Sequence, residues 1–124
     1  MTAQLLRYLV VGLANTMLGF AMILALDLGL GVNSLVSNAV GYVAGAICSY
    51  LLNRSYTFRS QRMHRKALPE FLALMLVCWL INAAILSIAR NALLWPALPS
   101  QALAVATYTI LFFLGSRRFV FRDR

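Results

Sequence analysis

The residues best suited to chemistry are arginines that stand among aromatic residues in two short segments. The segments are residues 53–59, Asn-Arg-Ser-Tyr-Thr-Phe-Arg, and residues 116–122, Ser-Arg-Arg-Phe-Val-Phe-Arg. A guanidinium group binds phosphate through two parallel hydrogen bonds, and aromatic rings anchor at the depth of lipid headgroups. The two segments suit a phospholipid-like substrate, and they equally suit plain anchoring to anionic lipids at about 1 kcal/mol per basic residue.

The elements that position these arginines are long uncharged runs. Of the 124 residues, 62% are hydrophobic and 11% are charged, whereas soluble domains carry about 25% charged residues, so a water-soluble monomer is excluded. The uncharged runs are residues 8–26, 28–53, 71–89 and 91–116. A bilayer core about 30 Å thick needs roughly 20 apolar residues in a helix, so each run can cross it once. We predict an all-α integral membrane protein with four transmembrane helices.

The connections between these helices follow from turn residues and charge. We expect one short turn around Gly29, Gly31, Asn33 and Ser34 and another around Trp95, Pro96, Pro99 and Ser100, so the helices form two hairpins. Of the eleven basic residues, all but Arg90 fall on one side of this arrangement. The positive-inside rule then places both termini in the cytoplasm. We expect a multi-pass protein of the cytoplasmic membrane. The net charge of +8 is explained by this asymmetry, and no nucleic-acid partner is expected.

The two halves of the chain align without a gap at an offset of 63 residues. We predict one domain over residues 1–124, built from repeat 1 at about 6–61 and repeat 2 at about 69–124. Each half enters and leaves on the same side, so the repeats are parallel, with a pseudo-two-fold axis along the membrane normal. Equivalent positions then carry opposite charges, and we expect Arg7 to pair with Glu70 and Asp27 with Arg90 across the axis.

Acidic residues, the single histidine and the cysteines form no catalytic constellation. Asp27 and Glu70 fall near opposite membrane faces, about 30 Å apart, and cannot share a reacting centre. His64 stands alone in a basic segment, while Cys48 and Cys78 fall inside spans as small packing residues. Neither a nucleophile with its base nor a set of metal ligands can be assembled. We expect no enzymatic activity, no metal and no cofactor.

Polar and small residues inside the spans have two interpretations each. The polar residues are Asn15, Thr16, Asn38, Asn82, Gln101, Thr107 and Thr109. They predict either hydrogen bonds between helices, worth about 0.6 to 2 kcal/mol each, or a polar track for a headgroup. Small residues recur at intervals of four in the second span, at Ser37, Gly41, Gly45 and Ser49. They favour close helix packing or a groove for a lipid chain.

The whole pattern resembles the GtrA-like family of small four-helix membrane proteins. The matching residues are 7–12 with Asn15 and Thr16, Asn38 with Gly41, residues 50–58, and residues 118–121. The Asn-Arg-x-aromatic-Thr-Phe segment is the most specific part. The sequence departs from the family at Ser49, where Asn is frequent, and at Tyr56, where Trp is common.

This resemblance implies translocation of a sugar linked through phosphate to a long polyprenyl chain. We hypothesise that Arg54, Arg59, Arg117 and Arg118 gather the phosphate at the cytoplasmic face. Asn15 and Asn38 would then hydrate the sugar partway, and Arg90 would receive the phosphate outside. The complete set of substrate-binding candidates is Arg7, Asn15, Asn38, Asn53, Arg54, Arg59, Arg90, Arg117 and Arg118.

The expected partners are the polyprenyl-phosphate-linked sugar, anionic membrane lipids and a membrane glycosyltransferase. We also expect a homodimer, because four packed helices leave little lumen and the track would lie in a lipid-facing groove or at a dimer seam. The alternative function is that of a non-transporting membrane subunit, which recruits or stabilises a polyprenyl-phosphate glycosyltransferase.

Overall fold

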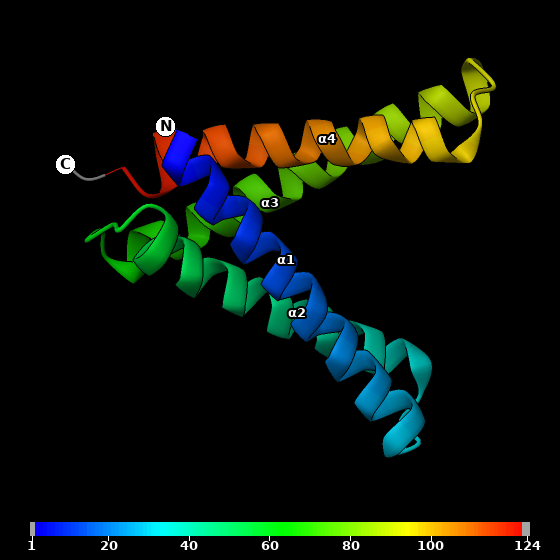
Figure 1. The fold of residues 1–124 in the computed structure, drawn as a ribbon, viewed down its shortest axis with the longest axis horizontal. Helices are drawn as coiled ribbons and strands as arrows, with labels where there is room; N and C mark the ends of the chain where they lie inside the picture. The colour runs from blue at the N-terminus through cyan, green and yellow to red at the C-terminus, as the bar shows by residue number, and fades with distance from the viewer. Residues whose placement is uncertain (1, 123–124) are drawn as a thin grey trace. The chain divides into compact units, whose positions relative to one another are not determined.

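Four long helices make up most of the chain (Figure 1). The computed structural model describes residues 2–122, so the last two residues of predicted repeat 2, Asp123 and Arg124, lie outside the described part. The helices are α1 (Thr2–Leu24), α2 (Ser34–Leu52), α3 (His64–Ser87) and α4 (Ala97–Gly115). With the turns that extend them, all four are long and apolar enough to cross a membrane, over Thr2–Gly29, Leu35–Thr57, His64–Ala92 and Ala97–Val120. The four predicted helices are confirmed in number and in approximate position, as helices able to cross a membrane.

The chain divides into two compact units, Met1–Ser60 and Gln61–Arg124. In the first unit α1 packs along α2, and in the second α3 packs along α4, so each unit is a helical hairpin. The predicted turn at the end of the second hairpin was wrong in part. Because α4 begins at Ala97, Pro99 and Ser100 belong to its first turn, where the missing amide of a proline breaks no helical hydrogen bond.

Each α-helix continues into a five-residue π-helical turn. These turns are η1 (Ala25–Gly29), η2 (Asn53–Thr57), η3 (Ile88–Ala92) and η4 (Ser116–Val120). In η2 the Phe58 amide donates to the Asn53 carbonyl over 2.9 Å, and in η4 the Phe121 amide donates to the Ser116 carbonyl over 2.9 Å. These bonds satisfy backbone carbonyls that a helix end otherwise leaves unpaired. Arg54, Arg117 and Arg118 therefore stand on ordered helix ends rather than on free loops.

The α2, α4 and π-helical elements of the two units have bounds that differ by 63 residues, the offset found in the sequence. The same offset relates two backbone positions in the left-handed region, Gly31 at φ 66° and Leu94 at φ 55°. The local structure thus recurs in both halves. The parallel two-fold arrangement of the halves stays a prediction, as do the repeat bounds and the cytoplasmic termini.

Small residues let the helices of each hairpin approach closely. A methyl group on Gly41 would come within 2.8 Å of the Gly19 carbonyl oxygen, and one on Gly115 within 2.7 Å of a Leu74 methyl carbon. The packing interpretation of the small-residue series is therefore confirmed at Gly41. In the second hairpin, the Phe71 ring meets the Phe112 ring edge to face, with centroids 5.1 Å apart.

Most large apolar side chains of the four helices point outward. Between 6% and 22% of the most apolar stretch of each span is buried. Such an exterior is unfavourable in water and natural in lipid, where side chains meet hydrocarbon and backbone polar groups are paired within the helix. The hydroxyl groups of Thr16 and Thr107 follow the same rule, since each donates to a carbonyl four residues earlier in its own helix.

Candidate functional site

The arginines of the first hairpin gather at the end where α1 begins and η2 finishes. The Arg7 guanidinium lies over the Tyr56 ring, 5.9 Å from its centroid, a cation–π distance. Arg54 is half-buried within η2. Arg59 is exposed just beyond η2, and its backbone lies in the left-handed region, with φ 48°. The structure thus brings three predicted site residues, Arg7, Arg54 and Arg59, to one end of the hairpin.

A buried chain of polar side chains supports this end. The Asn53 amide nitrogen donates to the Ser49 hydroxyl over 3.1 Å, and the Thr57 hydroxyl donates to the Asn53 amide oxygen over 2.8 Å. Asn53 is 1% exposed and Thr57 is fully buried. Both ends of the Asn53 amide are therefore engaged by the protein, which gives this predicted site residue a positioning role. Ser49, one of the two departures from the family pattern, has a polar role that the sequence did not indicate.

The second hairpin lacks this polar chain. Phe112, Ser116 and Val120 occupy the positions equivalent to Ser49, Asn53 and Thr57. The Ser116 hydroxyl is buried and has no hydrogen-bond partner among the described residues. The two arginine-rich ends are therefore built differently.

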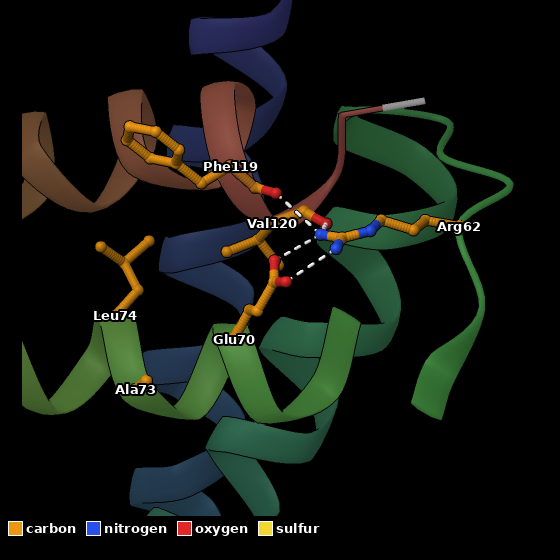
Figure 2. Close-up of a pocket in the computed structure, with 6 residues that line it drawn as sticks. All are labelled: Arg62, Glu70, Ala73, Leu74, Phe119 and Val120. Carbon is orange, nitrogen blue, oxygen red and sulfur yellow. Dashed lines mark hydrogen bonds and ion pairs between the residues drawn. The ribbon is translucent and has the colours of Figure 1, made fainter. Parts of the chain in front are cut away.

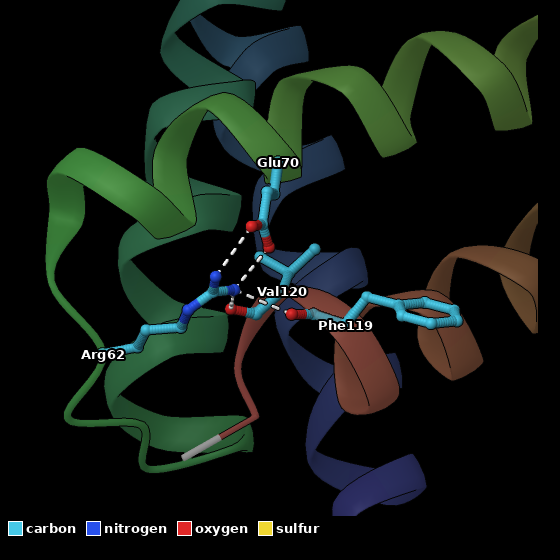
Figure 3. Close-up of polar contacts among 4 residues, drawn as sticks. All are labelled: Arg62, Glu70, Phe119 and Val120. Atoms are coloured by element: carbon cyan, nitrogen blue, oxygen red, sulfur yellow. Dashed lines mark hydrogen bonds and ion pairs between the residues drawn. The ribbon is translucent and has the colours of Figure 1, made fainter. Parts of the chain in front are cut away.

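An arginine that sequence reasoning treated only as a charge signal braces the second end (Figures 2 and 3). The two terminal nitrogens of Arg62 bond the two carboxylate oxygens of Glu70, and one of them also donates to the carbonyls of Phe119 over 2.7 Å and Val120 over 2.8 Å. These carbonyls belong to the final turn of η4, where a cation is favourable. The hydrogen bond to Glu70 raises the pKa of the Arg62 guanidinium above its ordinary value, so the group stays charged.

The same residues line a pocket of about 380 Å³, drawn in Figure 2, together with Ala73 and Leu74. Arg62 is occupied by Glu70 and by two carbonyls, so we assign it to bracing rather than to ligand binding. Glu70 stands at the position equivalent to Arg7, and Phe119 at that of Tyr56. The clearest sequence signal for Arg62 was Glu70 itself, a single acid near the start of α3 beside a basic segment.

A larger groove runs between α3 and α4 in the second hairpin, with a volume of about 790 Å³. Its lining comprises Leu74, Val77, Cys78, Ile81, Leu111, Leu114, Gly115, Arg117, Arg118, Phe119 and Arg122. The groove brings together two predicted site residues, Arg117 and Arg118, and adds Arg122, which was not among the candidates. One end of the groove is cationic and the rest of its length is apolar.

The remaining candidates lie away from the arginine-rich ends. The backbone of Asn15 passes Gly45 of α2, and its side-chain oxygen is buried with no hydrogen-bond partner among residues 2–122. Asn38 is exposed and stands seven residues before Gly45 on α2, about 10 Å along the helix axis. Arg90 is exposed at the far end of the second hairpin, where it donates to the Trp95 carbonyl over 3.1 Å.

The predicted pairs Arg7 with Glu70 and Asp27 with Arg90 join different units and stay predictions. Within residues 2–122, no group of three His, Cys, Asp or Glu side chains is placed to hold a metal ion.

Four apolar helices of membrane-spanning length, with apolar exteriors and arginines clustered at helix ends, define a small multi-pass membrane protein. Residues 7–121 match the family described as the GtrA/DPMS transmembrane domain, and the chain belongs to that family. The family is linked in general to translocation of polyprenyl-linked sugars, and its membrane domain is generally non-catalytic. No curated protein and no solved structure matches the chain.

Proposed function

We propose that this protein translocates a polyprenyl-phosphate-linked sugar across the cytoplasmic membrane. The observation that carries the proposal is the gathering of arginines at one end of each hairpin, beside long apolar surfaces. Guanidinium groups suit the phosphate, and the apolar exterior suits the polyprenyl chain. Family membership supports the same substrate class.

The phosphate is the part of this substrate that a bilayer opposes. Moving an unshielded ion into hydrocarbon carries a Born cost of tens of kcal/mol, whereas the polyprenyl chain can remain in lipid throughout. In the proposed route Arg54, Arg59, Arg117 and Arg118 gather the phosphate at the cytoplasmic face. Asn15 and Asn38 hydrate the sugar on the way, and Arg90 receives the phosphate outside. The substrate gradient supplies the driving force.

The route requires the topology predicted from charge, with both termini in the cytoplasm and Arg90 outside. We further propose that the protein works as a homodimer, with the route either in a lipid-facing groove or at the dimer seam. Asn53 contributes by positioning η2 through its bonds to Ser49 and Thr57.

A second candidate function is recruitment or stabilisation of a membrane glycosyltransferase without transport. The family description favours it, because it groups GtrA with the transmembrane domain of DPMS, the abbreviation of a glycosyltransferase, dolichol-phosphate-mannose synthase. The exposed arginines would then contact an acidic surface of the glycosyltransferase.

Reconstitution into liposomes distinguishes the two functions. We expect the purified protein to move a polyprenyl-phosphate-linked sugar between leaflets, and Arg54→Gln to slow this movement about tenfold or more, the effect of losing one charged hydrogen bond. Arg65→Gln is the matched control, because Arg65 is an exposed arginine of α3 outside both arginine clusters. Absence of movement, together with co-purification and activation of a glycosyltransferase, would establish the second function instead.

A further inference from the structure

We propose that the groove between α3 and α4 binds the phosphate and the first isoprenoid units of the carrier lipid, with Arg117, Arg118 and Arg122 holding the phosphate. The identity of the lipid rests on the proposed function. The assignment of the site to the second hairpin, and of Arg122 to the phosphate, comes from the groove itself.

The walls of the groove form a single apolar strip. On α3 they are Leu74, Val77 and Ile81, and on α4 they are Leu111 and Leu114. Leu74 to Ile81 spans seven residues, about 10 Å of helix. The helices approach closely at one end, where Gly115 leaves room for Leu74. One strip of this kind matches one hydrocarbon chain, as an isoprenoid has, rather than the paired chains of a diacyl phospholipid.

The cationic end of the groove has guanidinium groups that no described residue engages by a hydrogen bond. Among residues 2–122, neither Arg117 nor Arg122 has a hydrogen-bonding, ion-pair or ring partner. The guanidinium carbon of Arg118 lies 6.0 Å from the centroid of the Phe119 ring. The π-helical turn η4 carries Arg117 and Arg118, and the chain then returns Arg122 to the same groove. Arg62, by contrast, is committed to Glu70 and the η4 carbonyls, so it fixes the turn on which the groove arginines stand.

Equivalent positions of the first hairpin are less suited to this ligand. Ser55 stands at the position equivalent to Arg118, so the end of the second helix carries two arginines instead of three, and the third arginine of this end, Arg7, lies over the Tyr56 ring. Asn15 stands at the position equivalent to the groove residue Cys78, and its buried side-chain oxygen has no hydrogen-bond partner in the described part of the chain. Arginines that complement the phosphate and an unbroken apolar wall that suits the isoprenoid chain occur together only at the positions of the second hairpin. We therefore assign the lipid-binding site to that hairpin.

Equilibrium binding of a polyprenyl phosphate to the purified full chain in nanodiscs tests this inference. Separate variants test the site for the phosphate and the site for the isoprenoid chain. We expect Arg117→Gln combined with Arg122→Gln to weaken binding about tenfold or more. The charge-matched control is Arg65→Gln combined with Lys66→Gln, two basic residues at the start of α3 outside the groove lining, and it should bind as the unaltered protein does.

For the tail, Leu114→Trp fills the groove and Leu103→Trp is the control, since both leucines belong to α4 and are 45% exposed but only Leu114 lines the groove. We expect Leu114→Trp alone to weaken binding of polyprenyl phosphate while leaving binding of inorganic phosphate unchanged. A photoreactive polyprenyl phosphate should label peptides of α3 and α4.

Equal binding by the arginine variant and its control, or labelling confined to α1 and α2, would overturn the inference. Diacyl phosphatidic acid competing as strongly as polyprenyl phosphate would also overturn it, by making the groove a site for ordinary phospholipid. Leaflet exchange measured on the same variants separates this inference from the proposed function. Groove-dependent binding without exchange rejects only the translocation function, and exchange that is insensitive to both groove variants rejects only the groove site.

Discussion

Arg62 shows how one side chain can connect a loop, a helix start and a helix end. Its guanidinium joins Glu70 of α3 to the carbonyls of Phe119 and Val120 in η4. In the first hairpin the residue equivalent to Glu70 is Arg7, whose guanidinium faces η2 directly over Tyr56. Both hairpins therefore hold a guanidinium against the end of their second helix. In the first hairpin α1 carries that guanidinium itself, and in the second α3 binds it through Glu70.

This comparison predicts an unusual rescue. Arg62→Ala should lower the thermal unfolding temperature, because Glu70 and two η4 carbonyls lose their donor. Adding Glu70→Arg to Arg62→Ala should recover part of the loss, since it gives α3 the arginine that α1 has at Arg7. Thermal unfolding in detergent measures both effects, with Arg65→Ala as control. A double variant less stable than Arg62→Ala would contradict the equivalence.

The pKa of Arg62 is raised by its hydrogen bond to Glu70, so the contribution of this arginine to the free energy of unfolding is present below that pKa. It therefore persists through neutral and mildly alkaline pH.

The buried polar chain of the first hairpin gives a second residue-scale prediction. Asn53→Ala leaves the hydroxyl groups of Ser49 and Thr57 without their partner and should cost about 1 to 3 kcal/mol of unfolding free energy. Ser116→Ala, the equivalent change in the second hairpin, removes a buried hydroxyl that has no partner among the described residues and should be neutral or stabilising. Chemical denaturation in mixed micelles measures both. Equal destabilisation by the two changes would show that the hairpins do not differ in this way.

The connection between the two helices of each hairpin depends on an uncommon backbone conformation. Gly31 and Leu94 occupy equivalent positions with φ near 60°, yet only glycine adopts this conformation without strain. A side chain at Gly31 would meet no atom within 4 Å, so its effect on stability comes from the backbone alone.

We therefore expect opposite results from exchanging the two residues. Gly31→Leu should destabilise the first hairpin by about 1 kcal/mol, and Leu94→Gly should be neutral or stabilise the second by a few tenths of that amount. Thermal unfolding of the two single variants and of the double variant provides the measurement. A loss of stability with Leu94→Gly would mean that contacts of its side chain outweigh the strain.

The sequence predicted the number of helices, their pairing along the chain and the arginine-rich ends. Uncharged runs bounded by Arg7, Asp27, Glu70 and Arg90 were sufficient, because charge is costly in hydrocarbon. The π-helical turns could not be predicted. In such a turn each backbone amide bonds the carbonyl five residues earlier instead of four, and this difference does not alter the hydropathy pattern of the sequence. Nor could the role of Arg62, because its acceptors in η4 lie 57 and 58 residues away in the sequence.

The proposed translocation route depends on the predicted membrane topology, in which both termini are cytoplasmic and Arg90 is outside. In a variant with Cys48→Ala and Cys78→Ala, a single cysteine at Gln61 should be labelled by membrane-impermeant reagent only from the cytoplasmic side. A cysteine at Asn33 or Leu94, in the two helix connections at the other end, should be labelled only from outside. Labelling of Gln61 and Asn33 from the same side would contradict the assignment of four crossings.

Leaflet exchange in sealed liposomes measures the proposed translocation itself. A polyprenyl-phosphate-linked sugar placed in one leaflet should become accessible in the other only when the protein is present. The rate of exchange should fall about tenfold or more when Arg117 and Arg122 are both changed to Gln. It should stay the same when Arg65 and Lys66 are both changed to Gln. Exchange at the rate of protein-free liposomes, with the folded protein reconstituted, would show that this protein does not translocate the lipid-linked sugar.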